Sequence, residues 1–366
     1  MGNGIEKDIR HVRESDVKKS RVSISAEQGD ERMEEPLVSV LMVTYNHARY
    51  IRKSIDGVLA QRTNFPYELV IGEDCSTDGT RQIVFDYQRR YPDTIRVITS
   101  ERNVGGKKNV IRTRRACRGK YIAFCEGDDY WHHPEKLQMQ ADFLENHPEC
   151  GLVYSNYNVE DVRSKTLIRD FISYKEWVVQ DKLTPMYFLD GKMSVTILTC
   201  TVMVRNELLK KVIEADPYLY ESGHFLMGDI QTWVEVSAIA ETGYIPESLA
   251  TYNVSEESAT RSNNVLSELR FQASLSELTL YLSNKYNMSG DVRERRLEQW
   301  CDASLRLALH ERNAALAKEI RKRKRIFTWK DRYRYFGALN ALGYYSYILS
   351  LSLKKRLTRR RKKWYE

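Results

Sequence analysis

Three acidic side chains stand within four residues, directly after a short apolar segment. Tyr121 to Phe124 has the composition of a buried strand, and Glu126, Asp128 and Asp129 follow it. Ligands of an open α/β sheet bind outside the carboxyl ends of its strands. Neighbouring carboxylates repel one another, and an all-oxygen set at this spacing suits Mg²⁺ or Mn²⁺ shared with phosphate oxygens. A polar turn before the next helix is the alternative, because Asp and Gly are common in turns.

The elements that must position these acids begin near residue 36. Apolar runs of strand length alternate with segments of helical spacing, and polar residues stand at the end of each run. This alternation predicts a parallel, doubly wound sheet with right-handed crossovers. Strands are predicted at 37–43, 67–71, 95–98, 121–124 and 152–154, and helices at 47–60, after residue 80, at 107–117 and at 135–146.

Length and composition limit the number of domains, the cellular compartment and the kind of partner. The chain of 366 residues has room for one large domain or two ordinary ones. Its six cysteines show no C-x-x-C pair or zinc spacing, and no secretory signal is recognisable, which predicts reduced and mostly buried thiols in the cytoplasm. Residues 321–366 hold 16 basic and two acidic side chains, whereas the rest of the chain is mildly acidic. An anionic partner surface is therefore expected at the C-terminus.

Four short motifs occur at the predicted strand ends, in chain order. They are Val-Thr-Tyr-Asn, Glu-Asp-Cys-Ser-Thr-Asp-Gly-Thr, Asn-Val-Gly-Gly and Glu-Gly-Asp-Asp-Tyr-Trp. Together they resemble the family-2 glycosyltransferases, strongly over residues 37–160 and onward to about 255. The resemblance implies an α/β GT-A fold with a doubly wound, mostly parallel, Rossmann-like sheet and a helical C-terminal extension. It also implies inverting, metal-dependent transfer from a nucleotide sugar, which we expect to be a UDP-sugar. The acceptor implied is a hydroxyl of a glycan or lipid-linked molecule in cell-surface polysaccharide synthesis.

The resemblance also implies roles for single residues. Asp74 corresponds to the uracil or ribose contact, and Asp128 to the ligand of the Mn²⁺ or Mg²⁺ cofactor. Glu126 replaces the family's first Asp with a side chain one methylene longer, which suits contact with ribose or with the metal through water. Asp78 is expected to cap the next helix. The other residues expected beside the nucleotide are Thr44, whose alternative role is to end its strand, Asn46, Asn103 and Asn109.

Gly228-Asp229-Ile230 opens a further predicted helix. An Asp in a first helical turn is often only a favourable cap. In the family an acid at this place serves as general base, and Asp229 is the only acid from Gly223 to Val234. We therefore expect Asp229 to be the catalytic base.

Other residues near the motifs, and the strands that follow them, can also be assigned. His132 and His133 are poor metal candidates, because Pro134 predicts that His133 lies at a helix N-terminus. Strands are predicted at 195–204 and 252–255, the second returning to the site. The Arg and His that relatives often have near Asn253 are absent, so the resemblance does not extend to a diphosphate contact from this strand. Acceptor recognition is expected between residues 160 and 225.

The C-terminal third has a different character. Two long amphipathic helices are predicted between 265 and 319, followed by basic clusters at 321–325 and 359–363 around an uncharged run at 336–353. This arrangement favours a helix lying on an anionic membrane surface, at the inner face of the cell membrane. A solvated tail or a nucleic-acid contact is the alternative, but no nucleic-acid-binding fold accompanies it. The predicted divisions are a disordered leader 1–35, a GT-A domain 36–258, a helical extension 259–325 and a basic amphipathic tail 326–366.

Two other functions fit parts of the pattern. A sugar-nucleotide pyrophosphorylase shares a related nucleotide fold, but it normally needs a Gly-rich basic loop after the first strand, and Thr44-Tyr45-Asn46-His47 is not one. A non-catalytic membrane-bound scaffold could retain the fold, but the three acids Asp74, Asp128 and Asp229 argue against it.

Overall fold

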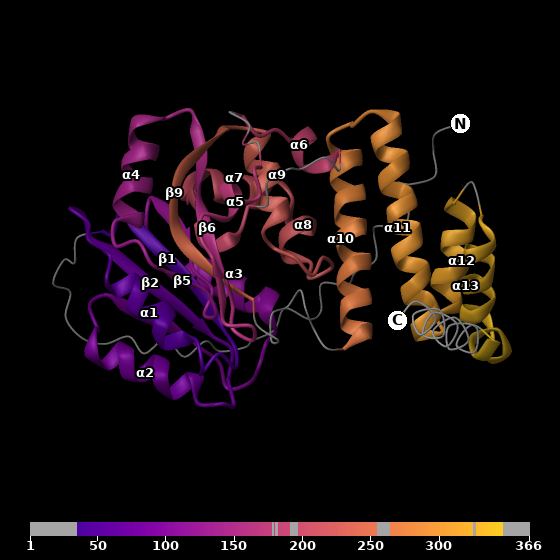
Figure 1. Cartoon of the computed structure of the whole chain (residues 1–366), viewed down its shortest axis with the longest axis horizontal. Coiled ribbons are helices and arrows are strands. Elements are labelled where there is room, and N and C mark those ends of the chain that lie inside the picture. The colour runs from indigo at the N-terminus through magenta and orange to yellow at the C-terminus, as the bar shows by residue number, and fades with distance from the viewer. Residues whose placement is uncertain are drawn as a thin grey trace, which may run out of the picture. The chain divides into compact units, whose positions relative to one another are not determined.

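Nine strands form one mixed sheet in the part of the chain that the structure describes (Figure 1). Their order is β3-β2-β1-β4-β8-β6-β9-β5, with β7 paired to β6. The pairs among β3, β2, β1 and β4 are parallel, β8 is antiparallel to both neighbours, and β9 is parallel to β6 but antiparallel to β5. The bounds are β1 Val38–Thr44, β2 Tyr67–Glu73, β3 Ile95–Ile98, β4 Tyr121–Phe124, β5 Tyr130–Trp131, β6 Cys150–Asp161, β7 Thr166–Ile168, β8 Met203–Arg205 and β9 Glu241–Val254.

The computed structural model describes residues 35–177, 179, 182–190, 197–254, 264–324 and 327–346, which belong to one unit starting at Glu35. Apart from Glu35, the predicted leader lies outside the described residues. The same holds for the basic cluster at 359–363, for most of the second half of the uncharged run, and for residues 195, 196 and 255 of two predicted strands.

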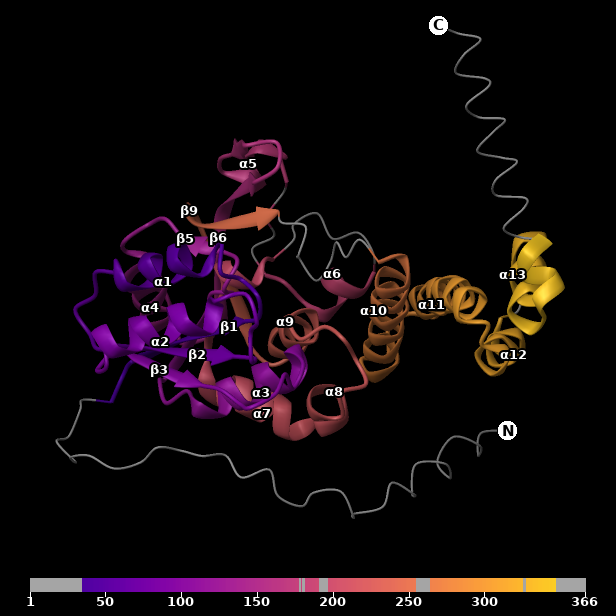
Figure 2. The ribbon, with the colours of Figure 1, turned by 90° about the horizontal axis from the view of Figure 1, so that it is seen from below.

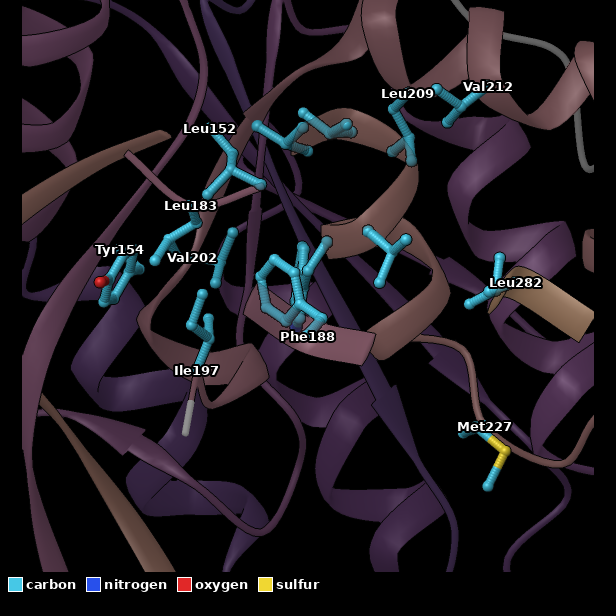
Figure 3. Packing of buried hydrophobic residues seen from close by; sticks show 14 of the residues in the cluster. Leu152, Tyr154, Leu183, Phe188, Ile197, Val202, Leu209, Val212, Met227 and Leu282 are labelled. Carbon is cyan, nitrogen blue, oxygen red and sulfur yellow. The ribbon is translucent and has the colours of Figure 1, made fainter. Parts of the chain in front are cut away.

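Alternate side chains of the central strands enter two separate cores, because successive residues of a strand point to opposite faces. Val38, Val40 and Met42 of β1 pack with residues of α1, α2 and α4. Leu41 belongs to the other core, which contains residues of α7, α9 and α10 together with the end of α3 (Figure 3). The helices are α1 Ile51–Leu59, α2 Thr80–Arg90, α3 Gly106–Ala116, α4 Lys136–Asn146, α5 Phe171–Tyr174, α6 Pro185–Leu189, α7 Asn206–Ala215, α8 Pro217–Glu221, α9 Ile230–Ser237, α10 Val265–Lys285, α11 Gly290–Glu311, α12 Ala314–Arg323 and α13 Trp329–Leu339.

The C-terminal helices α10 to α13 follow one another beyond the sheet in both views (Figures 1 and 2). Lys285 at the end of α10 holds this extension against the sheet domain: its Nζ donates to Asp216 Oδ2 at 2.8 Å and to Glu235 Oε2 at 2.7 Å on α9. Helices α11, α12 and α13 share a third, smaller core around Trp300 and Leu305. None of the helices among the described residues is long and apolar enough to cross a bilayer.

Most predicted elements are confirmed, and two differ. The chain from Thr199 to Thr201 forms a 3₁₀ turn, not the predicted strand, because Thr201 Oγ1 and N both donate to Leu198 O and bend the backbone locally. The second predicted long helix is divided in two. Arg312 adopts a left-handed conformation with φ 53°, and Asn313 then caps α12 by accepting from Leu316 N.

Candidate functional site

The loops after β1, β2 and β4 meet around Thr44 at the carboxyl end of the sheet. Asp74 N donates to Thr44 O at 3.1 Å, and Gly127 N donates to Val43 O at 3.0 Å. A Cβ on Gly127 would lie 2.7 Å from Thr44 Oγ1 and 2.9 Å from His47 Nδ1, so only glycine lets the acidic motif approach β1 this closely. The crossing from β1 to β4 is also where the strand order reverses, which is where open α/β sheets bind ligands.

Three of the predicted acids lie close enough to influence one another. The pKa of Glu126 is raised to about 8, first by burial and then by the negative charges of Asp128 and Asp229. The Glu126 Oε2 atom is buried and has no hydrogen-bond partner. The structure thus brings residues from β4 and α9, about 100 positions apart in the chain, to one place.

Two neighbouring elements hold the backbone of the acidic motif. Ser54 of α1 donates to Gly127 O at 3.1 Å and to Asp129 O at 2.5 Å. On the other side, Asn253 at the end of β9 donates from Nδ2 to Asp128 O at 2.5 Å and from its main-chain N to Asp129 Oδ1 at 2.9 Å. Burial, followed by the charges of Asp128 and Glu126, raises the pKa of Asp129 well above its usual range. Asp129 therefore orients the motif, and the N-cap of α4 is Glu135.

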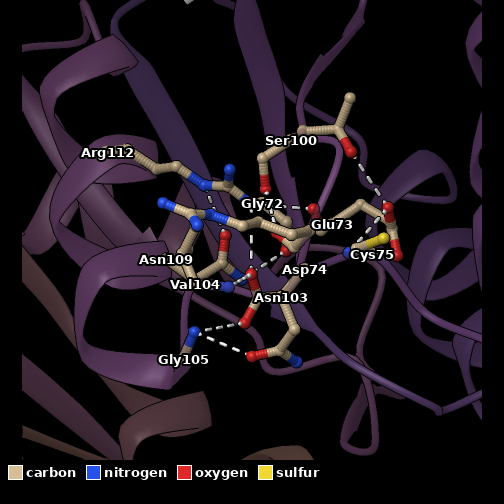
Figure 4. Close-up of polar contacts among 12 residues, drawn as sticks. Gly72, Glu73, Asp74, Cys75, Ser100, Asn103, Val104, Gly105, Asn109 and Arg112 are labelled. Atoms are coloured by element: carbon tan, nitrogen blue, oxygen red, sulfur yellow. Dashed lines mark hydrogen bonds and ion pairs between the residues drawn. The ribbon is translucent and has the colours of Figure 1, made fainter. Parts of the chain in front are cut away.

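Asp74 organises the Asn-Val-Gly-Gly turn (Figure 4). Its carboxylate accepts from Val104 N at 2.8 Å and from Gly105 N at 2.9 Å, and Arg112 Nη2 lies 3.5 Å away. Asn103 Oδ1 also accepts from Gly105 N, at 2.9 Å. These contacts build the loop in which a nucleotide is expected; the nucleotide contacts of Asp74 and Asn103 stay predictions.

Asn109 and Asn46 are also engaged in contacts within the protein. Asn109 is buried, donates to Gly72 O at 2.7 Å and accepts from Arg112 Nε at 2.9 Å. Asn46 has φ 56°, and its Oδ1 accepts from Thr77 N at 2.9 Å. Asn46 thus joins the loop after β1 to the loop after β2, and Asn109 joins α3 to β2. The predicted nucleotide contacts of both residues stay predictions.

Asp78 has the predicted structural role. Its Oδ1 accepts from Thr80 N at 3.0 Å at the start of α2, and its Oδ2 accepts from Ala48 N at 2.9 Å. The carboxylate therefore joins the helix N-terminus to the loop after β1, although Gly79 is the N-cap residue itself.

Asp229 is the N-cap of α9, and its Oδ1 accepts from Ile230 N at 2.7 Å. This contact is the helix-capping role that the sequence offered as the alternative to catalysis. The loop before it is held on two sides: Leu226 N donates to Ser274 Oγ of α10, and Lys107 Nζ of α3 donates to Met227 O. One helical turn further, Trp233 packs edge-on against Phe124, the last residue of β4, with ring centroids 5.9 Å apart. These contacts keep Asp229 beside the acidic motif.

The two histidines after the motif have protein partners. The His132 ring nitrogens lie 2.9 Å from Thr251 Oγ1 and 2.8 Å from Ser248 O, so the ring is held on β9. His133 Nδ1 accepts from Glu135 N at 3.3 Å at the N-terminus of α4, as predicted. Among the described residues, no three His, Cys, Asp or Glu side chains are grouped so as to hold a metal ion.

Buried polar atoms without partners point to residues that sequence reasoning passed over. Four of the eight such side-chain atoms in the described part of the chain border the acidic motif: Thr44 Oγ1, His47 Nδ1, Glu126 Oε2 and Asn253 Oδ1. Native proteins pair nearly all buried polar atoms, so water, an ion or a ligand is expected to complete the bonding at this place. His47 and Asn253 have no motif that singles them out in the sequence.

Residues 39–212 match the family model described as glycosyl transferase family 2. This match assigns the segment 39–212, slightly less than half of the chain, to glycosyltransferase family 2. The predicted fold class is confirmed, with the α/β sheet of this family followed by a helical C-terminal region.

Curated relatives match the family-2 domain to different extents. An uncharacterized protein of Mycobacterium tuberculosis is 46% identical over 117 residues, 32% of this chain and 34% of the relative. The chain thus spans about a third of the length of the first relatives it matches. The putative teichuronic acid biosynthesis glycosyltransferase TuaG of Bacillus subtilis is 28% identical over 60% of this chain and 80% of its own. The Escherichia coli UDP-Glc:alpha-D-GlcNAc-diphosphoundecaprenol beta-1,3-glucosyltransferase WfgD is 27% identical over 66% of this chain and 85% of its own.

Proposed function

We propose that the protein is an inverting glycosyltransferase that moves a sugar from a UDP-sugar to a hydroxyl group of a glycan or lipid-linked acceptor. The observation that carries the proposal is the grouping of Glu126, Asp128 and Asp229 at the carboxyl end of a family-2 sheet. The names of TuaG and WfgD, which refer to teichuronic acid and to a lipid diphosphate acceptor, support a role in surface-glycan assembly. Residues 36–258 would form the catalytic domain.

Asp229 is the residue we assign as general base. Its Oδ1 is held by Ile230 N, and the helix N-terminus favours the negative charge of the carboxylate. The other carboxylate oxygen would accept the proton of the acceptor hydroxyl. As the oxygen of the acceptor hydroxyl bonds to the sugar carbon, the bond from the same carbon to the diphosphate breaks, and the nucleoside diphosphate leaves with the electron pair of that bond. A single displacement of this kind inverts the configuration at the carbon.

A divalent cation fits the acidic motif. The donor atoms are carboxylate oxygens, and the buried, unpartnered Glu126 Oε2 is of the kind that Mg²⁺ or Mn²⁺ prefers. Mg²⁺ is commonly held by one or two carboxylates together with substrate phosphates, so a cluster of three acidic or histidine ligands is not required. Asp128 and Glu126 would hold the ion, which when bound would offset the charge on the departing diphosphate.

Asp229→Asn tests the assignment of the base. Asn is as good an N-cap as Asp, so α9 should remain folded, while transfer from UDP-sugars should fall by roughly 10² to 10⁴-fold because the base is lost. Asp86→Asn is the matched control, since Asp86 pairs with Arg89 on α2 and should not affect turnover. Turnover of Asp229→Asn within a few-fold of the wild type would show that Asp229 is not the base.

Further measurements on the wild-type protein separate the alternative functions. A panel of nucleotide sugars with MnCl₂, followed by release of the nucleoside diphosphate, identifies the donor. Consumption of a nucleoside triphosphate would instead indicate a pyrophosphorylase. Absence of calorimetric binding of UDP with Mn²⁺ would indicate a scaffold without catalysis.

We also propose that the C-terminal helices hold the enzyme on the cytoplasmic face of an anionic membrane. Within the described residues, the three most exposed large hydrophobic side chains all belong to this region: Leu342 at 87%, Trp329 at 73% and Tyr345 at 64%. Phe336 is exposed seven residues after Trp329, on the same side of α13. Basic groups lie beside two of them: Lys330 Nζ is 5.8 Å from the centroid of the Trp329 ring, and Arg312 Cζ is 5.6 Å from that of Tyr345. Each Lys or Arg near an anionic leaflet contributes about 1 kcal/mol.

A further inference from the structure

Asn253 lies at the end of β9, in contact with the turn that carries Asp128. β5 and β9 pair Tyr130 with Thr251 and Trp131 with Ala250. Asp128 precedes β5, in a turn where Asp129 N donates to Glu126 O at 3.1 Å. Asn253 Nδ2 donates to Asp128 O at 2.5 Å, and Asn253 N donates to Asp129 Oδ1 at 2.9 Å. The Asn253 side chain therefore lies against the main chain of the acidic motif.

The orientation of the Asn253 amide is determined by its contacts. Asp128 O can only accept, so the amide nitrogen faces it, and Oδ1 is the atom directed elsewhere. Asn253 is 3% exposed, and its Oδ1 has no partner in the part of the chain that the structure describes. A buried amide oxygen beside the motif thus lacks a partner, as does Glu126 Oε2.

Glu126 Oε2 and Asn253 Oδ1 are both hydrogen-bond acceptors without partners, and the carboxylate of Asp128 belongs to the same motif as Glu126. A cation bonds to several acceptor oxygens at once, whereas a further hydrogen-bond acceptor would be repelled. An amide oxygen is a hard ligand of the type that suits Mg²⁺ and Mn²⁺, and it adds no charge to a site where three carboxylates already repel one another.

We propose that Asn253 Oδ1 is an additional oxygen ligand of the divalent cation, together with Asp128 and Glu126. The inference rests on the cation site of the proposed function, and it gives β9 a part in that site beyond holding the motif backbone. The neutral amide would take the place on β9 where the sequence offers no Arg or His.

Direct Mn²⁺ binding tests the inference without reliance on turnover. The full chain is titrated with MnCl₂, with and without UDP, and free Mn²⁺ is followed by electron paramagnetic resonance. Asn253→Leu removes Oδ1 and should weaken Mn²⁺ binding by about tenfold or more, the range seen when supporting groups of metal sites are lost. Asn253→Asp keeps an oxygen at the same place and should bind Mn²⁺ at least as tightly as the wild type.

The two variants distinguish a metal ligand from a residue that only holds the motif backbone through its hydrogen bond to Asp128 O. Both substitutions remove the donor to Asp128 O. If Asn253 only holds the backbone, the two variants should lose Mn²⁺ affinity equally, and that result would overturn the inference. Asn206→Leu is the matched control, because buried Asn206 donates in the same way to Gly119 O away from the site. Wild-type affinity in a folded Asn253→Leu would also refute the inference and leave the proposed function standing. Failure of the wild type to bind Mn²⁺ even with UDP would remove the cation site itself.

Discussion

Lys136 offers a sharp test of the electrostatics beneath the acidic motif. It is the first residue of α4 and is fully buried, and its Nζ donates to Gln140 Oε1 at 2.5 Å and lies 4.3 Å from the centroid of the Trp131 ring. Burial lowers the pKa of its amine to about 7, against which the nearby Cys125 and Cys200 act only weakly. The unfolded chain should titrate near the ordinary lysine value of about 10.4.

The sign of the effect follows from the protons bound in each state. Between pH 7 and pH 10 the folded lysine is mostly neutral and the unfolded lysine is charged, so the unfolded state binds more protons and the free energy of unfolding rises with pH. Each pH unit contributes about 1.4 kcal/mol, and from pH 7.5 to 9.5 the gain is about 2.5 kcal/mol, since the folded amine is still partly charged at the lower pH. Below pH 7 this dependence disappears.

Lys136→Met removes the titrating group and keeps the length of the side chain. The assay is urea unfolding of both proteins under reducing conditions at pH 6, 7.5 and 9.5. The free energy of unfolding of the wild type relative to the variant should rise by about 2.5 kcal/mol between the two higher pH values, while the titrations of all other groups cancel. A difference that stays constant with pH would mean that Lys136 keeps its proton when folded, and the reasoning from burial would be refuted.

Two further substitutions test the site and the surface. Gly127→Ala should lower the free energy of unfolding by about 1–3 kcal/mol and weaken binding of UDP with Mn²⁺, because its Cβ would meet Thr44 Oγ1 at 2.7 Å; in Gly290→Ala, the control, a Cβ would meet nothing within 4 Å. Normal stability and binding in Gly127→Ala would contradict the close packing of the motif on β1. Replacing Trp329 and Phe336 together by Ala should reduce sedimentation of the protein with anionic vesicles. Tyr174→Ala, which removes a similarly exposed aromatic side chain of α5, should not. Equal sedimentation of the wild type and both variants would exclude α13 as the membrane-binding surface.

Local patterns in the chain account for much of what could be predicted. The apolar run of β1 and the helical spacing in α4 gave bounds within a few residues of those observed, because both depend on which side chains can be buried by neighbours in the chain. Asp229 could likewise be placed at a helix start. The strand predicted at 195–204 was wrong at 199–201, because Thr side chains compete for backbone partners and composition does not show which partner wins.

Residues whose roles depend on distant partners could not be assigned in this way. Lys136 looks like an ordinary surface position near a helix start, and only the packing of α4 against the sheet buries it. Asn253 is more than 120 positions from Asp128, and the pairing of β9 with β5 determines that they meet. The unpartnered atom of Asn253 is likewise visible only when all neighbouring donors are known.

By itself the sequence determined the family, the succession of strands and helices and the acids at the strand ends, since each depends on residue types and spacing within short segments. Tertiary structure alone decided that Glu126, Asp128 and Asp229 act on one another, that Asn253 faces the motif, and that Lys136 is buried. The physical reason is that charge interactions and desolvation depend on distances across the fold, which residues far apart in the chain acquire only when the sheet and its covering helices assemble.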